Sequence, residues 1–186
     1  ASCYLFLLHM GQRMSAVTVL TANEAEAEIG ELAEILWDCV EDGASVNFVK
    51  PFTREQARGF WRRVIASMNE GGTAMLGARH EGRLSGPVLL GLDTPPNQPH
   101  RADIKKLLVH RRARRHGQAT ALMAAAEAEA RRRGRTLLTL DTQCGSAAER
   151  LYRALGYTMF GIVPRYAVAP DGRTVDDCAF FYKALA

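Results

Sequence analysis

The chain has 186 residues, of which 47% are hydrophobic and 24% are charged, a balance typical of a globular protein that excludes an intrinsically disordered one. The length fits one domain, which we expect over residues 15–186 after an N-terminal tail over 1–14. No apolar run approaches the ~20 residues of a membrane helix, and the four cysteines lack metal-site spacing. We therefore expect a cytoplasmic protein with reduced thiols, no metal and no membrane partner.

The N-terminal half begins with a strand and two helices. Alternating apolar and Thr residues predict a strand over 16–20. Apolar residues at helical spacing then predict one helix that ends before Gly43 and another that ends before Gly71. Each helix opens with a capping box, in which a hydroxyl and a longer polar side chain satisfy the first N–H groups: Thr21 with Glu24, and Thr53 with Gln56.

Three strands follow the second helix. Their apolar residues place them over 73–79, 83–92 and 102–109. In a regular strand, Ile104 and Leu107 would lie on opposite faces of the sheet. We expect a β-bulge between them, because an extra residue would bring both onto one face.

Helices and strands alternate in the C-terminal half. We expect a helix over 117–133 and then a strand over 136–140, whose apolar and Thr residues indicate burial on both faces. A third capping box, Ser146 with Glu149, opens a helix that ends before Gly156. The last two strands are expected over 159–163 and 178–182, joined through a Pro-Asp-Gly turn.

The order of these elements determines the fold class. The strand, helix and strand over 102–140 form a unit with two parallel strands and a right-handed crossover, whereas short turns favour antiparallel pairing elsewhere. We therefore expect an α/β (α+β) protein with a mixed, mostly antiparallel sheet of about seven strands, a central parallel β-α-β unit and four helices on its faces.

The helix that begins near Gly117 lacks the capping residue that opens the other three. No Ser, Thr, Asp or Asn precedes it, and Arg114 and Arg115 stand beside its first turn. Free N–H groups at a helix N-terminus next to guanidinium groups form a favourable site for a phosphate or diphosphate. The alternative is that water satisfies these groups and the arginines form a solvated face.

Two motifs resemble those of the GCN5-related N-acetyltransferase (GNAT) family. Arg114-x-x-Gly117-x-Ala119, after the apolar residues 107–109, looks like the family's acetyl-CoA signature, and residues 148–157 look like its second motif, a helix with Tyr and then a Gly-aromatic pair. The motifs and element order together cover residues 16–185. Residues 43–48, 140–146 and 170–173 resemble tabtoxin-resistance-type acetyltransferases more closely.

The resemblance implies a GNAT fold and acetyl-CoA as co-substrate. The backbone of Leu108 and Val109, at the end of the third strand, would pair with the pantetheine arm, and the amides of the uncapped helix would hold the diphosphate. The residues that the resemblance assigns to acetyl-CoA are Leu107, Leu108, Val109, Arg114, Arg115, His116, Gly117, Gln118, Ala119, Thr120 and Ser146.

Acetyl transfer to an amine requires that the amine lose a proton and that the thiolate be protonated as it leaves. The resemblance makes Tyr152 the general acid, and Asp141 and Asp103, from two neighbouring strands, are the candidates for the base. A covalent route through Cys144 is the alternative to direct attack in a ternary complex, but no His lies near this cysteine in the sequence.

The loop between the first two helices is expected to bind the acceptor through Ser45, Asn47 and Phe48. The expected acceptor is a small primary amine, an amino acid or an antibiotic- or toxin-like molecule, and Lys50 or Arg165 could bind a carboxylate. Two other functions remain open at this point: a non-catalytic acetyl-CoA sensor, and a nucleic-acid-binding module that uses the basic clusters. We expect no nucleic-acid partner, because no stacking motif accompanies the arginines, and we consider a homodimer possible.

Overall fold

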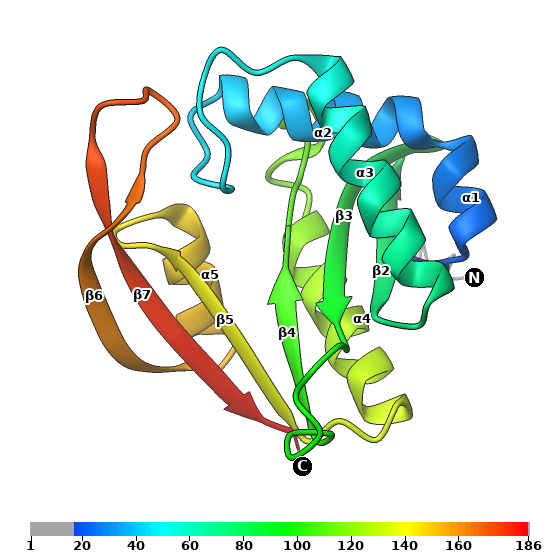
Figure 1. Cartoon of the computed structure of the whole chain (residues 1–186), viewed down its shortest axis with the longest axis vertical. Helices are drawn as coiled ribbons and strands as arrows, with labels where there is room; N and C mark the ends of the chain where they lie inside the picture. Colours follow the sequence, from blue (N-terminus) through cyan, green and yellow to red (C-terminus); the bar gives the residue numbers. More distant parts are fainter. Residues whose placement is uncertain (1–16, 186) are drawn as a thin grey trace, which may run out of the picture.

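The computed structural model describes residues 17–185 and contains a seven-stranded mixed sheet in the order β1-β2-β3-β4-β5-β7-β6 (Figure 1). The expected tail over 1–14 lies outside the described residues. The strands are β1 (Val17–Leu20), β2 (Thr73–His80), β3 (Arg83–Gly91), β4 (Arg101–Lys105), β5 (Leu137–Gln143), β6 (Thr158–Val168) and β7 (Val175–Ala184). The helices are α1 (Ala22–Ala27), α2 (Ile29–Glu41), α3 (Arg54–Asn69), α4 (Gln118–Arg132) and α5 (Ala147–Ala154), with a 3-10 turn, η1 (Arg111–Ala113).

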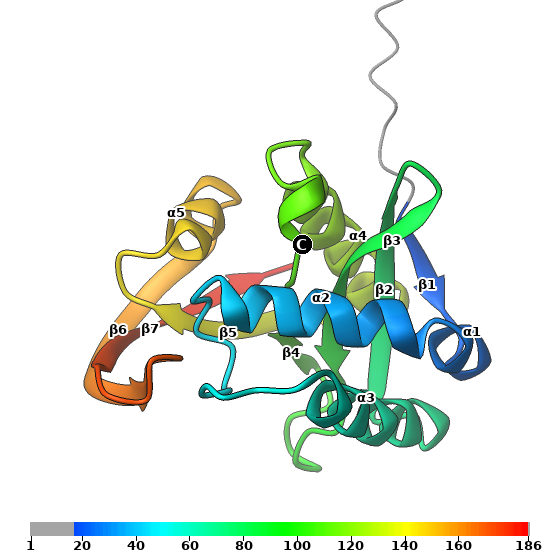
Figure 2. The ribbon, with the colours of Figure 1, turned by 90° about the horizontal axis from the view of Figure 1, so that it is seen from above.

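Helices cover both faces of the sheet (Figure 2). Alternation along β2 sends Met75 to the layer of α2 and α3, and Leu76 to the layer of α4. Between α2 and α3, the fully buried Trp61 donates its indole N–H to the carbonyl of Leu32 at 2.8 Å. The pair β4–β5 is parallel and the other pairs are antiparallel, so the predicted fold class is confirmed.

The described chain has five α-helices rather than the four predicted, because the first predicted helix is divided. Glu28 ends α1 with ψ of 15° and precedes α2. Its carboxylate forms an ion pair with Arg79 of β2, which holds the junction against the sheet. The first two capping boxes are confirmed, but in the third the Ser146 hydroxyl accepts from Glu149 while the Glu149 carboxylate accepts from Gly145 instead of Ser146.

The predicted strand over 102–109 is shorter, and the expected bulge is a strand end. β4 stops at Lys105, and Lys106 adopts a left-handed backbone conformation with φ of 51°. The chain nevertheless continues beside β3, because Leu108 N–H donates to Pro87 at 3.0 Å and His110 N–H donates to Ser85 at 2.9 Å.

The C-terminal strands are longer than predicted. β5 extends to Gln143, so Asp141 lies within the strand, opposite Phe180 of β7, rather than at its end. Burial on both faces of the predicted strand over 136–140 was a wrong prediction. Leu138 and Leu140 are buried on one face, whereas Leu137 and Thr139 on the other face are only half-buried. β6 is an edge strand, a position that tolerates Pro164 because no neighbour needs its missing N–H.

Candidate active site

The candidate site lies where β4 and β5 separate. The two strands pair only over residues 101–103 and 137–139, and Figure 1 shows them diverging beyond this point. The N–H groups of Leu108 and His110 bond to β3, so those of Leu107 and Val109, which alternate with them, face the opened side. A cavity of about 710 Å³ fills the separation.

Gly86 of β3 allows the segment after β4 to lie this close to β3. A Cβ atom at Gly86 would overlap the carbonyl oxygen of Leu108 and lie 3.3 Å from the Cα atom of Val109. On the other side of the segment, the buried carboxylate of Asp38 in α2 accepts from the N–H of Arg111 at 3.0 Å. These two features fix the path of the chain along the cavity.

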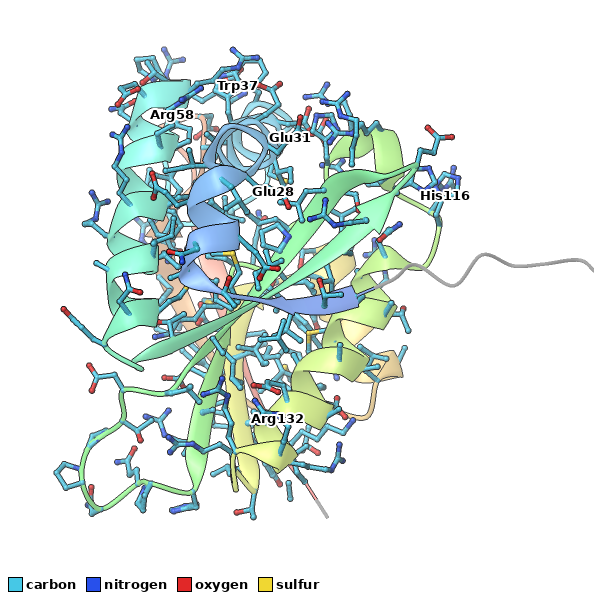
Figure 3. The ribbon with its side chains drawn as sticks, turned by 90° about the vertical axis from the view of Figure 1, so that its right-hand side faces the viewer. Glu28, Glu31, Trp37, Arg58, His116 and Arg132 are labelled. Carbon is cyan, nitrogen blue, oxygen red and sulfur yellow. The ribbon has the colours of Figure 1, made fainter. Side chains whose placement is uncertain are left out.

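The cavity brings together part of the predicted acetyl-CoA site. The predicted residues that line it are Leu107, Leu108, Val109, Arg114, Ala119 and Ser146. The predicted residues outside its lining are Arg115, His116, Gly117, Gln118 and Thr120. Of these, His116 is exposed (Figure 3). Its ring centroid lies 4.6 Å from that of His80. Gln118 is buried and accepts from the Ser85 hydroxyl at 3.3 Å.

The N-terminus of α4 has free donors, as the sequence predicts. Its N-cap is Gly117, with φ of 72° and no capping side chain, whereas the hydroxyls of Thr21, Thr53 and Ser146 cap α1, α3 and α5. Arg114 lines the cavity next to it, donates to the carbonyl of Val109 at 3.1 Å and forms an ion pair with Asp42. Open amides, the positive end of a helix and a guanidinium group fit a diphosphate.

Of the two candidate bases, the structure brings Asp141 to the cavity and not Asp103. The Asp141 side chain accepts from the thiol of Cys178 at 3.5 Å, and no cation lies within ion-pair distance of it among residues 17–185. Asp103 lies outside the lining, where Arg101 donates to it at 2.5 Å and the Thr139 hydroxyl also donates to it. Asp103 is therefore engaged in holding β4 to β5.

Tyr152 of α5 lines the same cavity and is 6% exposed. Its ring packs against Tyr157 and Phe181, with centroids 5.9 and 6.1 Å away. Burial, reinforced by the negative charge of Asp141, raises the pKa of Tyr152 above its ordinary value. The phenol therefore stays protonated at neutral pH and is available as a proton donor.

The cysteines near the cavity are neutral thiols at neutral pH. Burial raises the pKa of Cys178 to about 12 and that of Cys39 to about 11, and both line the cavity. Burial and the charge of Glu149 also raise the pKa of Cys144, which does not line it. None of these groups has the lowered pKa that an enzymatic thiolate nucleophile requires.

The loop after α2 contributes Ser45 and Asn47 to the cavity, but not Phe48. Phe48 packs against Phe52 and Phe60 instead, with ring centroids 4.5 and 5.4 Å away. Neither Lys50 nor Arg165, the residues considered for a carboxylate, lines the cavity.

Sequence reasoning missed several cavity residues with polar side chains, among them Lys106, Tyr166, Asp176 and Asp177. The two adjacent aspartates interrupt the otherwise apolar end of β7, which was the available signal. Asp176 accepts from Gln143 at 2.8 Å, and Asp177 accepts from the N–H of Arg165 at 2.8 Å. Within the described part of the chain, no helix could cross a membrane and no cluster of three or more potential metal ligands occurs.

Comparison with known proteins shows the family of this chain. Residues 30–157 match the family model described as "Acetyltransferase (GNAT) family". A ribosomal-protein-alanine N-acetyltransferase from Brucella melitensis has a TM-score of 0.74 at 24% identity, with 91% of this chain and 99% of that chain covered. An acetyltransferase from Salmonella typhimurium, solved with acetyl-CoA, has a TM-score of 0.73 at 20% identity, with 93% and 95% covered.

A third similar structure is named as a phosphinothricin N-acetyltransferase. Its TM-score is 0.72 at 16% identity, with 92% of this chain and 99% of that chain covered. These structures share the fold, and the family model spans more than half of the sequence. The chain therefore belongs to the acetyltransferase (GNAT) family, as its two motifs predict, and it is an acyltransferase with acetyl-CoA as its co-substrate.

Proposed function

We propose that the protein transfers the acetyl group of acetyl-CoA to the primary amine of a small molecule, by direct attack while both substrates are bound. The observation that carries this proposal is the joint lining of one cavity by Arg114 and Ala119 at the N-terminus of α4, and by Asp141 and Tyr152. The residues proposed to bind the diphosphate and those proposed to transfer protons thus line the same cavity.

In this proposal, two backbone features bind the co-substrate. The N–H groups of Leu107 and Val109 and the carbonyl of Leu107, which face the separation between β4 and β5, pair with the amides of the pantetheine arm, as an added strand would. The carbonyl of Val109 accepts from Arg114. The N–H groups at the start of α4 bind the diphosphate, and Arg114 adds positive charge. Acetyl-CoA supplies the activated acetyl group.

Two side chains then handle the protons. Asp141 binds the substrate ammonium and takes up its proton, directly or through one water molecule, so that the free amine can attack. As the C–N bond forms and the C–S bond breaks, the acetylated nitrogen releases its second proton to solvent. Tyr152 donates its phenolic proton to the departing sulfur and regains a proton from solvent, and Asp141 passes the ammonium proton to solvent. The raised pKa of Tyr152 keeps the donor protonated at neutral pH.

The state of the thiols supports direct attack over an acetyl-enzyme intermediate. The cavity thiols of Cys39 and Cys178 are protonated at neutral pH, because burial raises the pKa of each. Cys144, the residue considered for the covalent route, does not line the cavity. A Cys144→Ser variant is therefore expected to retain its turnover number.

Three carboxylates of the cavity support an acceptor that carries an ammonium group. Asp141, Asp176 and Asp177 line it, and none has an Arg or Lys within 4.0 Å among the described residues. The loop after α2 and the β6–β7 strands both contribute to the lining, which favours a compact acceptor over an extended chain. The arginine clusters, by contrast, form ion pairs with acidic residues, such as Arg112 with Glu31 and Arg132 with Glu129, which weakens the nucleic-acid alternative.

A panel of primary amines, assayed for thiol release from acetyl-CoA, tests the proposal. At least one small amine should be acetylated, and mass spectrometry should find the acetyl group on the amine and not on the protein. Calorimetric binding of acetyl-CoA without turnover on any amine would favour the sensor, and retained affinity for duplex DNA at 200 mM salt would favour the nucleic-acid module.

A further inference from the structure

Lys106 is the one lysine of the described chain without an ion-pair partner. Lys50, Lys105 and Lys183 lie within 4.0 Å of Glu41, Asp103 and Glu127, respectively. No carboxylate within residues 17–185 lies that close to the Lys106 ammonium. Burying part of a cation without a counter-ion costs folding free energy, so other contacts must keep Lys106 in this position.

The backbone at Lys106 is also unusual. It has φ of 51°, a conformation that costs a residue with a Cβ atom about 1 kcal/mol or more. The conformation occurs between the end of β4 and the segment 107–109, at the wall of the cavity. It places Lys106 between this cavity and a smaller one of about 240 Å³ beside α3.

Two aromatic rings hold the ammonium group there. Its Nζ atom lies 5.7 Å from the ring centroid of Phe48 and 5.6 Å from that of Phe60, within the range of cation–π attraction. Phe48, which the sequence analysis assigned to the acceptor, thus contacts a cavity residue instead of lining the cavity. The rings fix the cation without neutralising it, which leaves its charge available to an anion.

Asp141 provides the opposite charge on the same cavity. Burial lowers the pKa of Lys106, and the charge of Asp141 counteracts this effect, so the two groups interact through space. The Lys106 ammonium and the Asp141 carboxylate form no ion pair, which means that their charged atoms are more than 4.0 Å apart. Asp141 and Lys106 both line this cavity, and a carboxylate and a lysine that are separated in this way are complementary to a ligand that carries both charges.

We propose that Lys106 binds the carboxylate of an amino-acid acceptor whose ammonium group lies at Asp141. This inference rests on the proposed function and names its substrate class. It replaces Lys50 and Arg165 as carboxylate-binding candidates, because Lys50 donates to the carbonyl of Glu41 at 2.7 Å and neither residue lines the cavity.

The test compares amino acids with their carboxamides, which keep the amine and lose the negative charge. The wild-type enzyme should prefer amino acids in kcat/KM. Lys106→Met should lower kcat/KM for amino acids by about 10- to 100-fold, mainly through KM, because a charged hydrogen bond is lost. The carboxamides should be affected less than about twofold, and Lys106→Arg should recover part of the loss.

Lys50→Met is the matched control, since it removes a lysine charge outside the cavity, and it should not change the ratio of the two kcat/KM values. A wild-type preference for carboxamides, or an equal loss on both acceptor types in Lys106→Met, would overturn the inference. The second result would point to Lys106 as a group acting on the amine.

A binding measurement separates this inference from the proposed function. N-acetyl amino acids resemble products and keep the carboxylate, so with CoA present they should bind the wild-type protein more tightly than Lys106→Met, by about tenfold in calorimetric Kd. Equal affinities would reject the inference even if no amine is acetylated. Loss of thiol release with this difference intact would reject the proposed function alone. Thermal unfolding of each variant checks that it folds.

Discussion

Gly86 of β3 lies directly against the backbone of Leu108, in the segment that follows β4. A Cβ atom on Gly86 would overlap the carbonyl oxygen of Leu108. The contact is with backbone, which cannot rotate away as a side chain would. Hydrogen bonds from Leu108 to Pro87 and from His110 to Ser85 hold the segment at this distance. The position of the backbone groups proposed to pair with acetyl-CoA thus depends on a glycine of β3.

Gly86→Ala is therefore expected to weaken acetyl-CoA binding. The added methyl group must push residues 107–109 toward the cavity, which costs about 1–3 kcal/mol of stability and misplaces the pairing groups. Calorimetry should show at least about a tenfold increase in Kd for acetyl-CoA. Gly161→Ala is the control, because Gly161 lies in edge strand β6 and its Cβ atom would meet no atom within 4 Å. Unchanged affinity in Gly86→Ala would refute this role of the glycine.

Gly117→Glu should abolish acetyl-CoA binding, because it places a carboxylate at the open N-terminus of α4 where the diphosphate is expected. Backbone strain alone would also destabilise the variant, since Gly117 has φ of 72°. Gly134→Glu at the opposite end of α4 matches that strain with φ of 71° and open space for a side chain. Both variants should lose about 1–2 kcal/mol of unfolding free energy, but only Gly117→Glu should lose the calorimetric signal. Equal Kd values for the two variants would argue against the diphosphate site.

Local signals in the sequence were enough for most of the fold. The Thr21 and Thr53 capping boxes and the uncapped helix at Gly117 act through neighbouring residues, so a sequence pattern reports them directly. The division of the first helix at Glu28 has a long-range component, an ion pair with Arg79 in β2. Sequence spacing carries no information about such a partner.

The site was predicted less completely than the fold, for a related reason. The sequence makes both Asp141 and Asp103 candidates for the base and favours Asp141 only slightly. The structure separates them, because Asp141 lines the cavity whereas Asp103 accepts from Arg101 and Thr139. Lys106 gave no signal because its left-handed backbone and its contacts with Phe48 and Phe60 arise from tertiary packing. A charged residue that packing isolates from counter-ions cannot be recognised from sequence alone.

Asp141→Asn should lower kcat by about 10²–10⁴-fold, because the amide cannot take up the proton of the ammonium group. Acetyl-CoA affinity should stay within about twofold, since Asp141 has no part in diphosphate binding. Asp103→Asn removes the carboxylate that accepts from Arg101 and Thr139 in the same sheet. This variant should lower the melting temperature and leave kcat nearly unchanged. Single-turnover kinetics and thermal unfolding of both variants decide between them, and a larger kcat loss in Asp103→Asn would make Asp103 the base.

Tyr152→Phe removes the proposed proton donor and leaves the ring packing against Phe181 in place. The expected result is a fall in kcat of about 10²–10³-fold with unchanged acetyl-CoA affinity. Tyr157→Phe is the matched control, because Tyr157 is also a buried tyrosine but does not line the cavity. Burial raises the pKa of Tyr152, so the protonated donor persists to higher pH than an exposed tyrosine would allow. The wild-type kcat should consequently show no decline due to this group below about pH 10. A Tyr152→Phe variant with wild-type kcat would assign the phenol to packing and leave the thiolate to be protonated by solvent.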